Sequence, residues 1–296
     1  MNWSDGFIAV DWGTTNRRAY KLDARGGCSD EFSDGKGILS VPAGGFEAAV
    51  GEIRQNLGEL PLLLAGMIGS NRGWVEAPYV DCPAGPDELA KALVRAPGGS
   101  ALVVPGVAYR NGRCDVMRGE EVQILGAAAA GDIPPDCLIC HPGTHNKWTE
   151  LEAGRIVSIR TVMTGELFSL LKGKSILSDL MQGESNTGPA FAEGVTRSLS
   201  GAGLTAELFG ARASVLLGRA KAEDMPSFIS GLLIGEDVRV GISEGGARDR
   251  PVVVMGRPDL TRLYAAALSQ AGVESSAVSG ERAFIAGAAK IVELIR

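Results

Sequence analysis

Two short polar segments, each directly after an apolar run, contain residue types that bind phosphate groups. They are residues 11–18, Asp-Trp-Gly-Thr-Thr-Asn-Arg-Arg, and residues 141–148, His-Pro-Gly-Thr-His-Asn-Lys-Trp. In such turns backbone N–H groups and hydroxyls donate to phosphate oxygens, an acid such as Asp11 holds magnesium through water, and Lys147 adds a point charge. The alternative for either segment is an ordinary hairpin in which Asp and Asn only form the turn.

The occurrence of two such turns is more informative than either turn alone. Neither matches the Gly-x-x-x-x-Gly-Lys-Ser/Thr loop, and no Gly-x-Gly-x-x-Gly follows the first apolar run. Two hairpins that face one polyphosphate are the arrangement of the actin-like and sugar-kinase ATPases. We therefore expect nucleotide contacts from both turns, at Asp11, Gly13, Thr14, Thr15, Asn16, Gly143, Thr144, His145 and Lys147.

A third segment, residues 115–127, supplies candidates for a general base. Glu120 and Glu121 begin an alanine-rich helix just ahead of the second turn. This order resembles the bacterial glucokinase pattern, in which an acid accepts the proton of the substrate hydroxyl. Glu120 or Glu121 is therefore the expected catalytic base, with Asp115 as a further candidate. The alternative is that the two glutamates only stabilise the positive end of the helix dipole.

Histidines and cysteines do not indicate a metal centre. The two histidines, His141 and His145, cannot share a helical face because a Pro-Gly pair lies between them. Cys137 and Cys140 are three residues apart on an expected strand, so their side chains point to opposite faces and cannot bind one ion. Magnesium held by Asp11 is the metal that the sequence favours.

Composition and charge narrow the class of protein. Hydrophobic residues make up 45% of the 296 residues and charged residues 22%, which is typical of a globular chain. The net charge of −6 gives no general support for a nucleic-acid partner. No apolar run approaches the ~20 residues that span a membrane, and no signal-peptide pattern opens the chain. We expect a cytoplasmic protein with no membrane or nucleic-acid partner.

Strand-like and helix-like segments alternate, which predicts an α/β fold. The expected strands are residues 7–10, 19–22, 61–65, 101–104, 137–140, 148–151, 155–159 and 252–255. The expected helices are residues 46–57, 120–130, a long helix after Asp224, one from about residue 259, and a last helix with its apolar face at Phe284, Ala288, Ile291 and Ile295. Residues 130–136 form the predicted boundary. Each half opens with a strand, a Gly-containing polar turn and another strand, which suggests an internal duplication.

Motifs along most of the chain resemble the 2-dehydro-3-deoxygalactonokinase family. They are Ile-Ala-Val-Asp-Trp-Gly-Thr-Thr-Asn at 8–16, Ala-Gly-Met-Ile-Gly-Ser-Asn at 65–71 with Gly73 and Trp74, Ala-Pro-Tyr at 77–79, Val-Met-Arg-Gly-Glu-Glu at 116–121, Pro-Gly-Thr-His at 142–145 with Lys147 and Trp148, Arg-Thr-Val-Met-Thr-Gly-Glu-Leu at 160–167, and Ser-Gly-Leu-Leu-Ile-Gly at 230–235. The resemblance runs from residue 8 to about residue 290, in order and at plausible spacing.

This resemblance implies a two-domain actin-like ATPase (ribonuclease H-like) fold with ATP and magnesium in the cleft between the domains. Residues 1–130 would form the domain that binds the sugar acid and holds the first phosphate turn, and residues 131–296 the nucleotide-binding domain. Gly256 would approach the adenosine. The family has a turn similar to Gly-Thr-Ser-Leu-Thr there, whereas this chain has Gly-Arg-Pro-Asp-Leu, so hydroxyl contacts to the nucleotide are not expected at this turn.

The reaction implied is phosphorylation of 2-dehydro-3-deoxy-D-galactonate at its C6 hydroxyl, in galactonate catabolism. The substrate carboxylate needs a cation, and arginine gives the best bidentate match. Arginines near the motifs are Arg17, Arg18, Arg72, Arg118 and Arg160, of which Arg17 and Arg118 are favoured because they flank the first turn and the acids. Further expected substrate contacts are Ser70, Asn71, Trp74 and Glu166, although Trp74 could instead be a core aromatic and Glu166 a helix cap.

Two other functions are compatible with these motifs. One is a kinase for another sugar or sugar acid on the same fold, and the other is a nucleotide-binding regulator that has lost phosphoryl transfer. The acids beside the second turn argue against a regulator, because a binding module needs no base there. The sequence leaves the oligomeric state open, a homodimer being one alternative.

Overall fold

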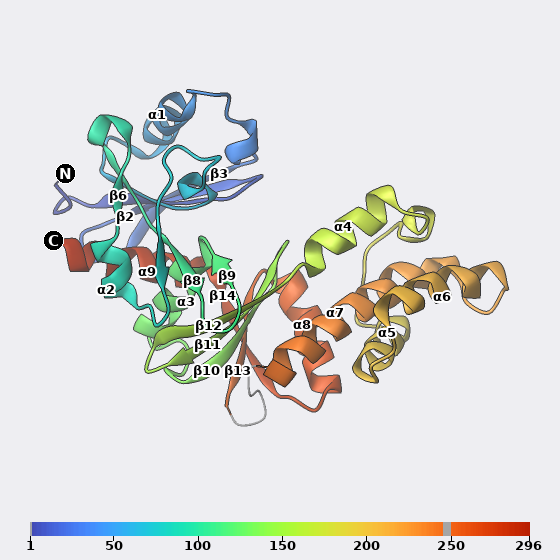
Figure 1. The fold of residues 1–296 in the computed structure, drawn as a ribbon. Coiled ribbons are helices and arrows are strands. Elements are labelled where there is room, and N and C mark those ends of the chain that lie inside the picture. The colour runs from blue at the N-terminus through green and yellow to red at the C-terminus, as the bar shows by residue number, and fades with distance from the viewer. Residues whose placement is uncertain (1, 245–249) are drawn as a thin grey trace. The chain divides into compact units, whose positions relative to one another are not determined.

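The computed structural model describes residues 2–244 and 250–296, and this part of the chain divides into two compact α/β units. The first unit comprises Met1–Pro135, Leu151–Ile159 and Gly280–Arg296. The second unit comprises Asp136–Glu150 and Arg160–Ser279. Figure 1 shows the course of the chain through both units.

The first unit contains a mixed sheet with the strand order β3-β2-β1-β4-β7-β6. Its strands are β1 (Phe7–Trp12), β2 (Arg17–Leu22), β3 (Cys28–Asp34), β4 (Leu62–Gly66), β6 (Val94–Arg95) and β7 (Ala101–Val103). β1 pairs antiparallel with β2 and parallel with β4, which in turn pairs parallel with β7. The apolar strands β1 and β4 are almost fully buried because helices cover both faces of the sheet.

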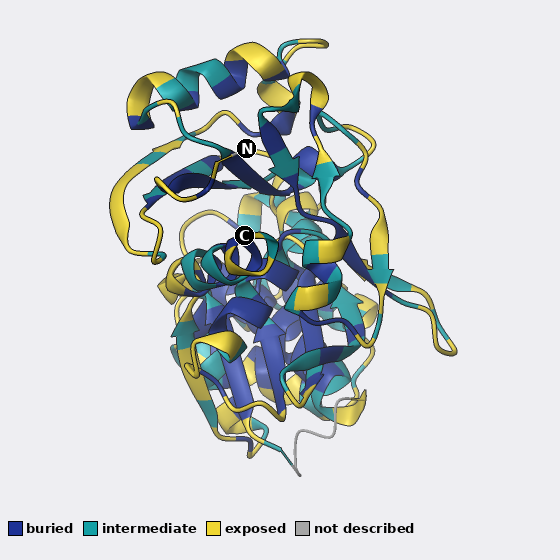
Figure 2. Cartoon of the chain, turned by 90° about the vertical axis from the view of Figure 1, so that its left-hand side faces the viewer, coloured by how far each residue is buried: buried dark blue, intermediate teal, exposed yellow. Residues whose placement is uncertain are grey.

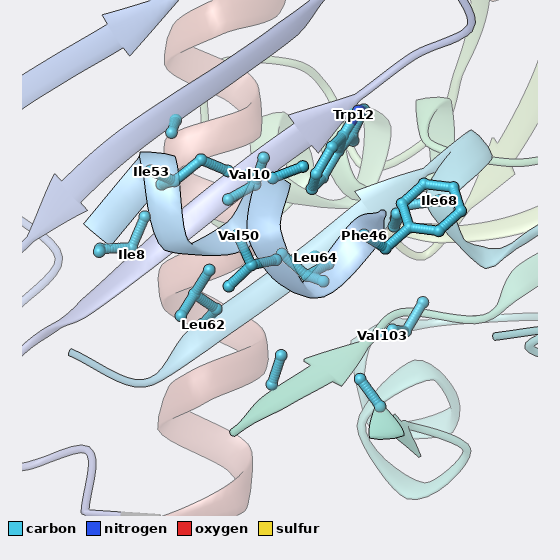
Figure 3. Packing of buried hydrophobic residues seen from close by; sticks show 14 of the residues in the cluster. Ile8, Val10, Trp12, Phe46, Val50, Ile53, Leu62, Leu64, Ile68 and Val103 are labelled. Atoms are coloured by element: carbon cyan, nitrogen blue, oxygen red, sulfur yellow. The ribbon is translucent and has the colours of Figure 1, made fainter. Parts of the chain in front are cut away.

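Helix α1 (Phe46–Leu57) packs on one face of this sheet. Its buried residues recur with a helical period, and its opposite side is exposed at the top of Figure 2. Figure 3 shows this side of the core, where α1 side chains meet alternate residues of the strands. The labelled residues are Ile8, Val10, Trp12, Phe46, Val50, Ile53, Leu62, Leu64, Ile68 and Val103. Burial of these large side chains is the main stabilising contribution to this face.

Helices α3 (Glu120–Ala129) and α9 (Gly280–Ile295) pack against each other within the first unit. A Cβ atom on Gly126 would lie 2.1 Å from the carbonyl oxygen of Ala283, so the two backbones approach as closely as glycine allows. Phe284 of α9 contacts Tyr20 of β2, with ring centroids 5.8 Å apart. The last helix therefore belongs to the first unit.

The remaining elements of the first unit are short. A small sheet has the order β5-β8-β9. The elements are β5 (Tyr79–Asp81), β8 (Gly106–Tyr109), β9 (Asp115–Met117), helix α2 (Pro86–Lys91), and the 3-10 helices η1 (Ile38–Ser40), η2 (Met67–Gly69) and η3 (Pro97–Gly99).

The second unit is built on a sheet with the order β12-β11-β10-β13-β14, of which all but residues 151–159 belongs to this unit. Its strands are β10 (Cys137–His141), β11 (Asn146–Glu152), β12 (Arg155–Val162), β13 (Val252–Gly256) and β14 (Ser275–Ser279). Its helices are α4 (Thr164–Lys174), α5 (Pro189–Leu199), α6 (Leu204–Leu216), α7 (Met225–Glu244) and α8 (Pro258–Gln270), with the 3-10 helices η4 (Ser178–Leu180) and η5 (Ala222–Asp224). α7 is apolar on most sides because α5, α6, α4 and α8 all pack on it.

The two sheets share one strand order. In each, three strands that are consecutive along the chain lie side by side, and the first of them also pairs in parallel with a later strand, β1 with β4 and β10 with β13. This shared order supports the internal duplication that the two polar turns suggest.

The structure differs from the expected domain division at 130/131 in three segments, of which residues 131–135 only move the boundary to Pro135. Residues 280–296 and 151–159 group with the first unit, because α9 packs on α3 and residues Ala84 and Ile156 form a backbone bridge. The α/β class and each expected strand and helix named above are confirmed. Strands β3, β5, β6, β8, β9 and β14 and helices α2, α5 and α6 were not expected. No helix among the described residues is long and apolar enough to span a membrane.

Candidate active site

The first polar turn joins β1 to β2 in the first unit. The Gly13 N–H donates to the Asn16 carbonyl at 2.9 Å and closes the turn, and the side chains of Thr14, Thr15 and Asn16 are exposed. A Cβ atom on Gly37 would lie 2.3 Å from the Thr14 backbone, so the segment before η1 supports the turn at very close range. The tip is thus held rigidly while its hydroxyls face solvent, as a phosphate-binding turn requires.

Asp11 lies at the end of β1, opposite Arg18 of β2. Burial raises the pKa of the Asp11 carboxyl to about 6, the Arg18 charge opposes this rise, and the nearby Glu120 adds to it. No described residue donates a hydrogen bond to this carboxylate. A carboxylate with a second acid beside it and no donor of its own is suited to a cation.

Glu120 and Glu121 are adjacent but differ in their surroundings. Glu120 is partly exposed, and one of its oxygens accepts the Arg118 backbone N–H at 3.0 Å. Glu121 is fully buried, and both of its oxygens lie within hydrogen-bond distance of the Gly119 N–H. Burial, with the Glu120 charge as the second cause, raises the pKa of Glu121 to about 8. At neutral pH Glu121 is therefore mostly protonated.

A close contact between two glycines brings the start of α3 to the end of β4. Gly119 has φ +105° and Gly66 has φ +94°, and a Cβ atom on Gly119 would lie 3.0 Å from the Gly66 Cα. A Cβ atom on Gly66 would in turn lie 2.8 Å from the carbonyl oxygen of Trp12. Only glycine fits both positions without strain, and this contact sets Glu120 near Asp11.

Arg17 does not lie where a ligand carboxylate could reach it, contrary to expectation. Its side chain is 1% exposed and bonds Asp34 at 2.9 Å through both Nε and Nη2, Glu52 at 2.6 Å and the Ala49 carbonyl at 2.7 Å. On the alternating pattern of β2, Arg17 points to the α1 face and Arg18 to the opposite face, which Asp11 shares. Arg17 is a structural ion-pair residue.

Arg118 is the favoured arginine that retains unused donors. Its Nη2 donates to the Ala77 carbonyl at 2.8 Å, and its guanidinium stacks 4.4 Å from the Tyr79 ring centroid. Its Nε and Nη1 are shielded from solvent and have no hydrogen-bond partner among the described residues. A Cβ atom on Gly69 would lie 3.0 Å from Nη1. A carboxylate therefore reaches these groups only if the Gly69 backbone or the Tyr79 ring shifts.

The expected sugar loop follows β4 in the same unit. The Ser70 hydroxyl donates to the Met67 carbonyl at 2.7 Å, whereas the Asn71 side chain is exposed. Trp74 is partly buried and packs against the α1 side of the core. Asn71 thus has a side chain open to a ligand, as does the adjacent Arg72, and Trp74 has a core role.

The second polar turn joins β10 to β11 in the second unit. Helix α4 begins against it, because the Glu166 N–H donates to the Thr144 carbonyl at 2.8 Å and a Cβ atom on Gly165 would lie 2.3 Å from the Gly143 carbonyl oxygen. The exposed side chains of His145 and Glu166 pair at 2.5 Å. Glu166 therefore lies beside this turn in the second unit, whereas the residues of the sugar loop belong to the first unit.

Lys147 is less available than expected. Its side chain is 6% exposed, and its Nζ donates to the Thr161 hydroxyl at 2.8 Å. On β11 it points to the face opposite Asn146 and Trp148. The structure therefore does not support direct phosphate contact by Lys147. Of the other arginines considered, Arg72 is exposed in the first unit, and Arg160 pairs with Glu244 at 3.2 Å in the second.

A cavity of about 340 Å³ in the second unit begins at this turn. Its walls come from the turn, from α4, α7 and α8, and from residues 183–185. They include the uncharged Pro142, Gly143, Thr164, Gly165, Phe168, Ser230, Leu233, Ile234, Leu260, Leu263 and Tyr264 and the charged Lys172, Glu184, Asp259 and Arg262. Apolar walls combined with polar and charged groups can hold a nucleoside together with its phosphates. Gly256 is not on this wall, but α8, which begins two residues later, forms one side.

Asp237 is a residue that the sequence analysis missed. It is fully buried on α7, and its carboxylate accepts four side-chain hydrogen bonds, from Asn146, Trp148, Thr164 and Tyr264. The sequence shows only that two adjacent acids, Glu236 and Asp237, interrupt a mainly apolar helical segment. It does not distinguish the buried Asp237 from Glu236, which pairs with Arg239 at 2.6 Å.

The residues of the first unit fit magnesium as a partly hydrated ion. Among the described residues no group of three or more acid, histidine or cysteine side chains could enclose a metal. Asp11 supplies one carboxylate without a donor, and magnesium is commonly bound by one or two carboxylates, waters and substrate phosphates. An ion held in this way would neutralise phosphate charge.

Comparison with known proteins gives the family. The model of the 2-keto-3-deoxy-galactonokinase family matches residues 11–291. An Escherichia coli (strain K12) protein named 2-dehydro-3-deoxygalactonokinase is 34% identical over 292 residues, which cover 98% of each chain. A crystal structure of a Sinorhizobium meliloti protein named for the same activity has a TM-score of 0.91, with 33% identity over 98% of this chain and 99% of that chain.

A more distant structure agrees on the fold alone. The activator of 2-hydroxyisocaproyl-CoA dehydratase from Clostridium difficile, solved with ADPNP, has a TM-score of 0.51 at 14% identity and covers 98% of this chain and 96% of its own. The expected actin-like ATPase fold is thereby confirmed. The family model and the E. coli relative both match the chain along nearly its whole length. The chain therefore belongs to the 2-keto-3-deoxy-galactonokinase family of sugar-acid kinases.

Proposed function

We propose that this kinase transfers the γ-phosphoryl group of ATP to the C6 hydroxyl of 2-dehydro-3-deoxy-D-galactonate, in galactonate catabolism. The family and the name of the E. coli relative support this substrate. The observation that carries the chemistry is the pair of acids Asp11 and Glu120, which lie close enough for the charge of Glu120 to raise the pKa of Asp11. One acid would hold the metal and the other would accept a proton.

Glu120 is the proposed general base. It is partly exposed, it retains an oxygen for which no hydrogen bond is found among the described residues, and the Arg118 N–H orients it at 3.0 Å. As the hydroxyl oxygen bonds to the γ-phosphorus and the bond to ADP breaks, Glu120 takes the hydroxyl proton. In phosphoryl transfer this proton moves late, so positioning and charge neutralisation provide most of the acceleration. Glu121 is too deeply buried for this role.

Each polar turn is proposed to contain phosphate-binding groups. The cavity of the second unit would hold the adenosine between α7 and α8, and the N–H groups of the turn at Gly143 and Thr144 would donate to phosphate oxygens. In the first unit, the exposed Thr14, Thr15 and Asn16 are the side chains proposed to bind phosphate oxygens. Asp11 would hold the magnesium ion, which neutralises charge on the phosphates. The His145–Glu166 pair lies beside the second turn and would orient it.

The substrate carboxylate is proposed to bind Arg118. Its Nη1, which has no hydrogen-bond partner among the described residues, would donate to a carboxylate oxygen once the neighbouring Gly69 backbone or Tyr79 ring shifts. Stacking on Tyr79 fixes the plane of the guanidinium. Arg18, on the same face of the sheet as Asp11, would add positive charge near the reacting groups. Asn71 would donate to a sugar hydroxyl.

A coupled assay of ADP release tests the substrate. ATP is supplied with the 2-keto-3-deoxy acid, with its C4 epimer, with galactonate, and with glucose and glycerol. Turnover is expected to be highest with 2-dehydro-3-deoxy-D-galactonate, and phosphorus–proton correlation spectra of the product should show the phosphate on C6. Turnover with glucose or glycerol but not with the keto acid would refute the proposal. Tight ATP binding without turnover on any acceptor would indicate a regulator.

A further inference from the structure

The Asp237 carboxylate collects hydrogen bonds from three separate elements around the proposed nucleotide site. Its Oδ1 accepts from Asn146 Nδ2 at 2.8 Å and from Trp148 Nε1 at 2.7 Å, both on β11. Its Oδ2 accepts from the Thr164 hydroxyl at the start of α4 and from the Tyr264 hydroxyl on α8, both at 2.5 Å. All five side chains lie in the second unit.

A buried acid of this kind is not explained by stability alone. Burial raises the pKa of Asp237, and the four donors oppose that rise. Apolar residues of similar volume often replace a buried charged group without loss of stability. A satisfied polar group in a core does, however, specify one arrangement of the elements that meet at it. The four hydrogen bonds to Asp237 therefore specify one arrangement of β11, α4 and α8 around α7.

Two of the donors set the second polar turn. Asn146 is the first residue of β11, three residues after Gly143, and Trp148 follows on the same face of the strand. Trp148 also packs on the α7 backbone, because a Cβ atom on Gly241 would lie 2.0 Å from its ring. The strand that leaves the turn is thus fixed to α7 by two hydrogen bonds and by close packing.

The other two donors set the cavity wall. Thr164 and Tyr264 both line the cavity, whereas Asp237 does not. Thr164 precedes Gly165, whose backbone packs on the Gly143 carbonyl. The two hydroxyls that meet at Oδ2 therefore fix the start of α4 and the face of α8 at distances set by one carboxyl group.

We propose that Asp237 is a positioning residue that holds the phosphate turn and the walls of the nucleoside cavity in one geometry, and that its effect is on ATP and not on the sugar acid. This inference rests on the proposed nucleotide site in the second unit. Asp237 touches neither the cavity nor the turn tip, so its influence on ATP passes through its four donors.

The chemistry of the donors predicts different results for two substitutions. In Asp237→Asn the remaining oxygen can accept from Asn146 and Trp148, and the new amide can donate to the hydroxyls of Thr164 and Tyr264, which can act as acceptors. Asp237→Leu removes every acceptor and leaves four buried donors without a partner. The KM for ATP should change less than about 3-fold in Asp237→Asn and rise roughly 10- to 100-fold in Asp237→Leu.

The experiment measures kcat, the KM for ATP, the KM for the sugar acid, and the melting temperature of these variants. Thr164→Val and Tyr264→Phe each remove one donor and are made as well, so the inference remains testable if Asp237→Leu does not fold. Each should raise the KM for ATP about 3- to 10-fold and leave the KM for the sugar acid within about 2-fold. The matched control is Ser198→Ala, which removes a buried hydroxyl that bonds the Leu232 carbonyl at 2.7 Å; neither residue lines the cavity or belongs to the turn.

Three results would overturn the inference. If Asp237→Leu, Thr164→Val and Tyr264→Phe lower the melting temperature as Ser198→Ala does but leave the KM for ATP unchanged, Asp237 has only a structural role. If Asp237→Asn is as impaired as Asp237→Leu, hydrogen bonding to the four donors is not the cause. Leu260→Trp, which fills the cavity from α8, identifies a failure of the site itself: an unchanged KM for ATP in this variant would refute both the nucleotide site and the role of Asp237.

Discussion

The Gly119 backbone N–H lies 2.8 and 2.7 Å from the two carboxyl oxygens of Glu121, and this contact separates the roles of two adjacent glutamates. Glu121 turns back onto the backbone at the start of α3 and is fully buried. Glu120, one position earlier, remains partly exposed on the side of Asp11. The helix therefore presents one acid to the reaction and uses the other to close its own first turn.

Glu120→Gln is expected to lower kcat about 10²- to 10⁴-fold, because the amide cannot accept the hydroxyl proton. ATP binding should change little. Glu121→Gln should retain kcat within about 10-fold, since burial already keeps the Glu121 carboxyl mostly neutral at pH 7. Steady-state kinetics with both substrates, together with ATP titration, measure both effects. Equal losses in the two variants would contradict the assignment, and near-native kcat in both would make Asp115 the next candidate.

The stability of the protein should depend on pH through Glu121. Its pKa is raised from 4.5 to about 8 in the folded chain, so the folded state binds more protons than the unfolded state between these values. The contribution of Glu121 to the free energy of unfolding is therefore fully present below pH 4.5. It decreases by about 1.4 kcal/mol per pH unit as the pH rises from 4.5 to 8. Urea unfolding at pH 5 to 8 should show the stability of the wild type falling relative to Glu121→Gln. A constant difference between the two proteins would contradict the raised pKa.

Magnesium dependence should weaken in acid through Asp11. Its pKa is about 6, and protons compete with the metal below that value. The magnesium concentration for half-maximal rate should rise about tenfold per pH unit below pH 6. At saturating magnesium, the fall of the rate in acid should occur at lower pH. Asp11→Asn should lose most activity and this pH dependence. Asp30→Asn, at an exposed acid, is the control. If the magnesium dependence of the rate is unchanged in Asp11→Asn, Asp11 does not belong to the metal site.

Arg17→Met should destabilise the protein without changing substrate affinity. Arg17 is 1% exposed, but its partners Asp34 and Glu52, at 2.9 and 2.6 Å, are partly exposed, so loss of the two ion pairs should cost about 1 kcal/mol. The KM for the sugar acid in the folded variant should stay within about 2-fold. Chemical unfolding and kinetics at low temperature separate the two effects, with the exposed Arg25→Met as control. A large rise in the KM would return Arg17 to the substrate site.

Arg118→Lys should raise the KM for the sugar acid roughly 10- to 100-fold and leave the KM for ATP within about 2-fold, because lysine has no planar guanidinium to stack on Tyr79 and to donate from the Nη1 position. Arg110→Lys is the matched control, since Arg110 is an exposed arginine of the same unit that pairs with Asp81 at 2.6 Å. Unchanged affinity for the sugar acid in Arg118→Lys would exclude Arg118 as the carboxylate ligand.

Local sequence patterns predict most of the strands and helices of the fold. The apolar run before Asp11, the helical spacing of Phe46 and Ile53, and the Gly-containing turns each predict one element, and the structure contains those elements. Strands such as β14 were missed because their residues, Ser275–Ser279, lack an apolar run. The last helix was predicted, but its unit was not, since a periodic apolar face does not specify its partner.

The amino-acid sequence is sufficient to predict the residue types of the site and their order along the chain, namely the two polar turns and the acids before α3, and also the family. The availability of those side chains to a ligand depends on the folded chain. Arg17 and Arg18 differ because alternate residues of β2 face opposite sides of the sheet. Burial separates Glu120 from Glu121, and four donors from distant segments meet at Asp237. Direction and burial of a side chain depend on neighbours that are far away in sequence, which is why no local pattern shows them.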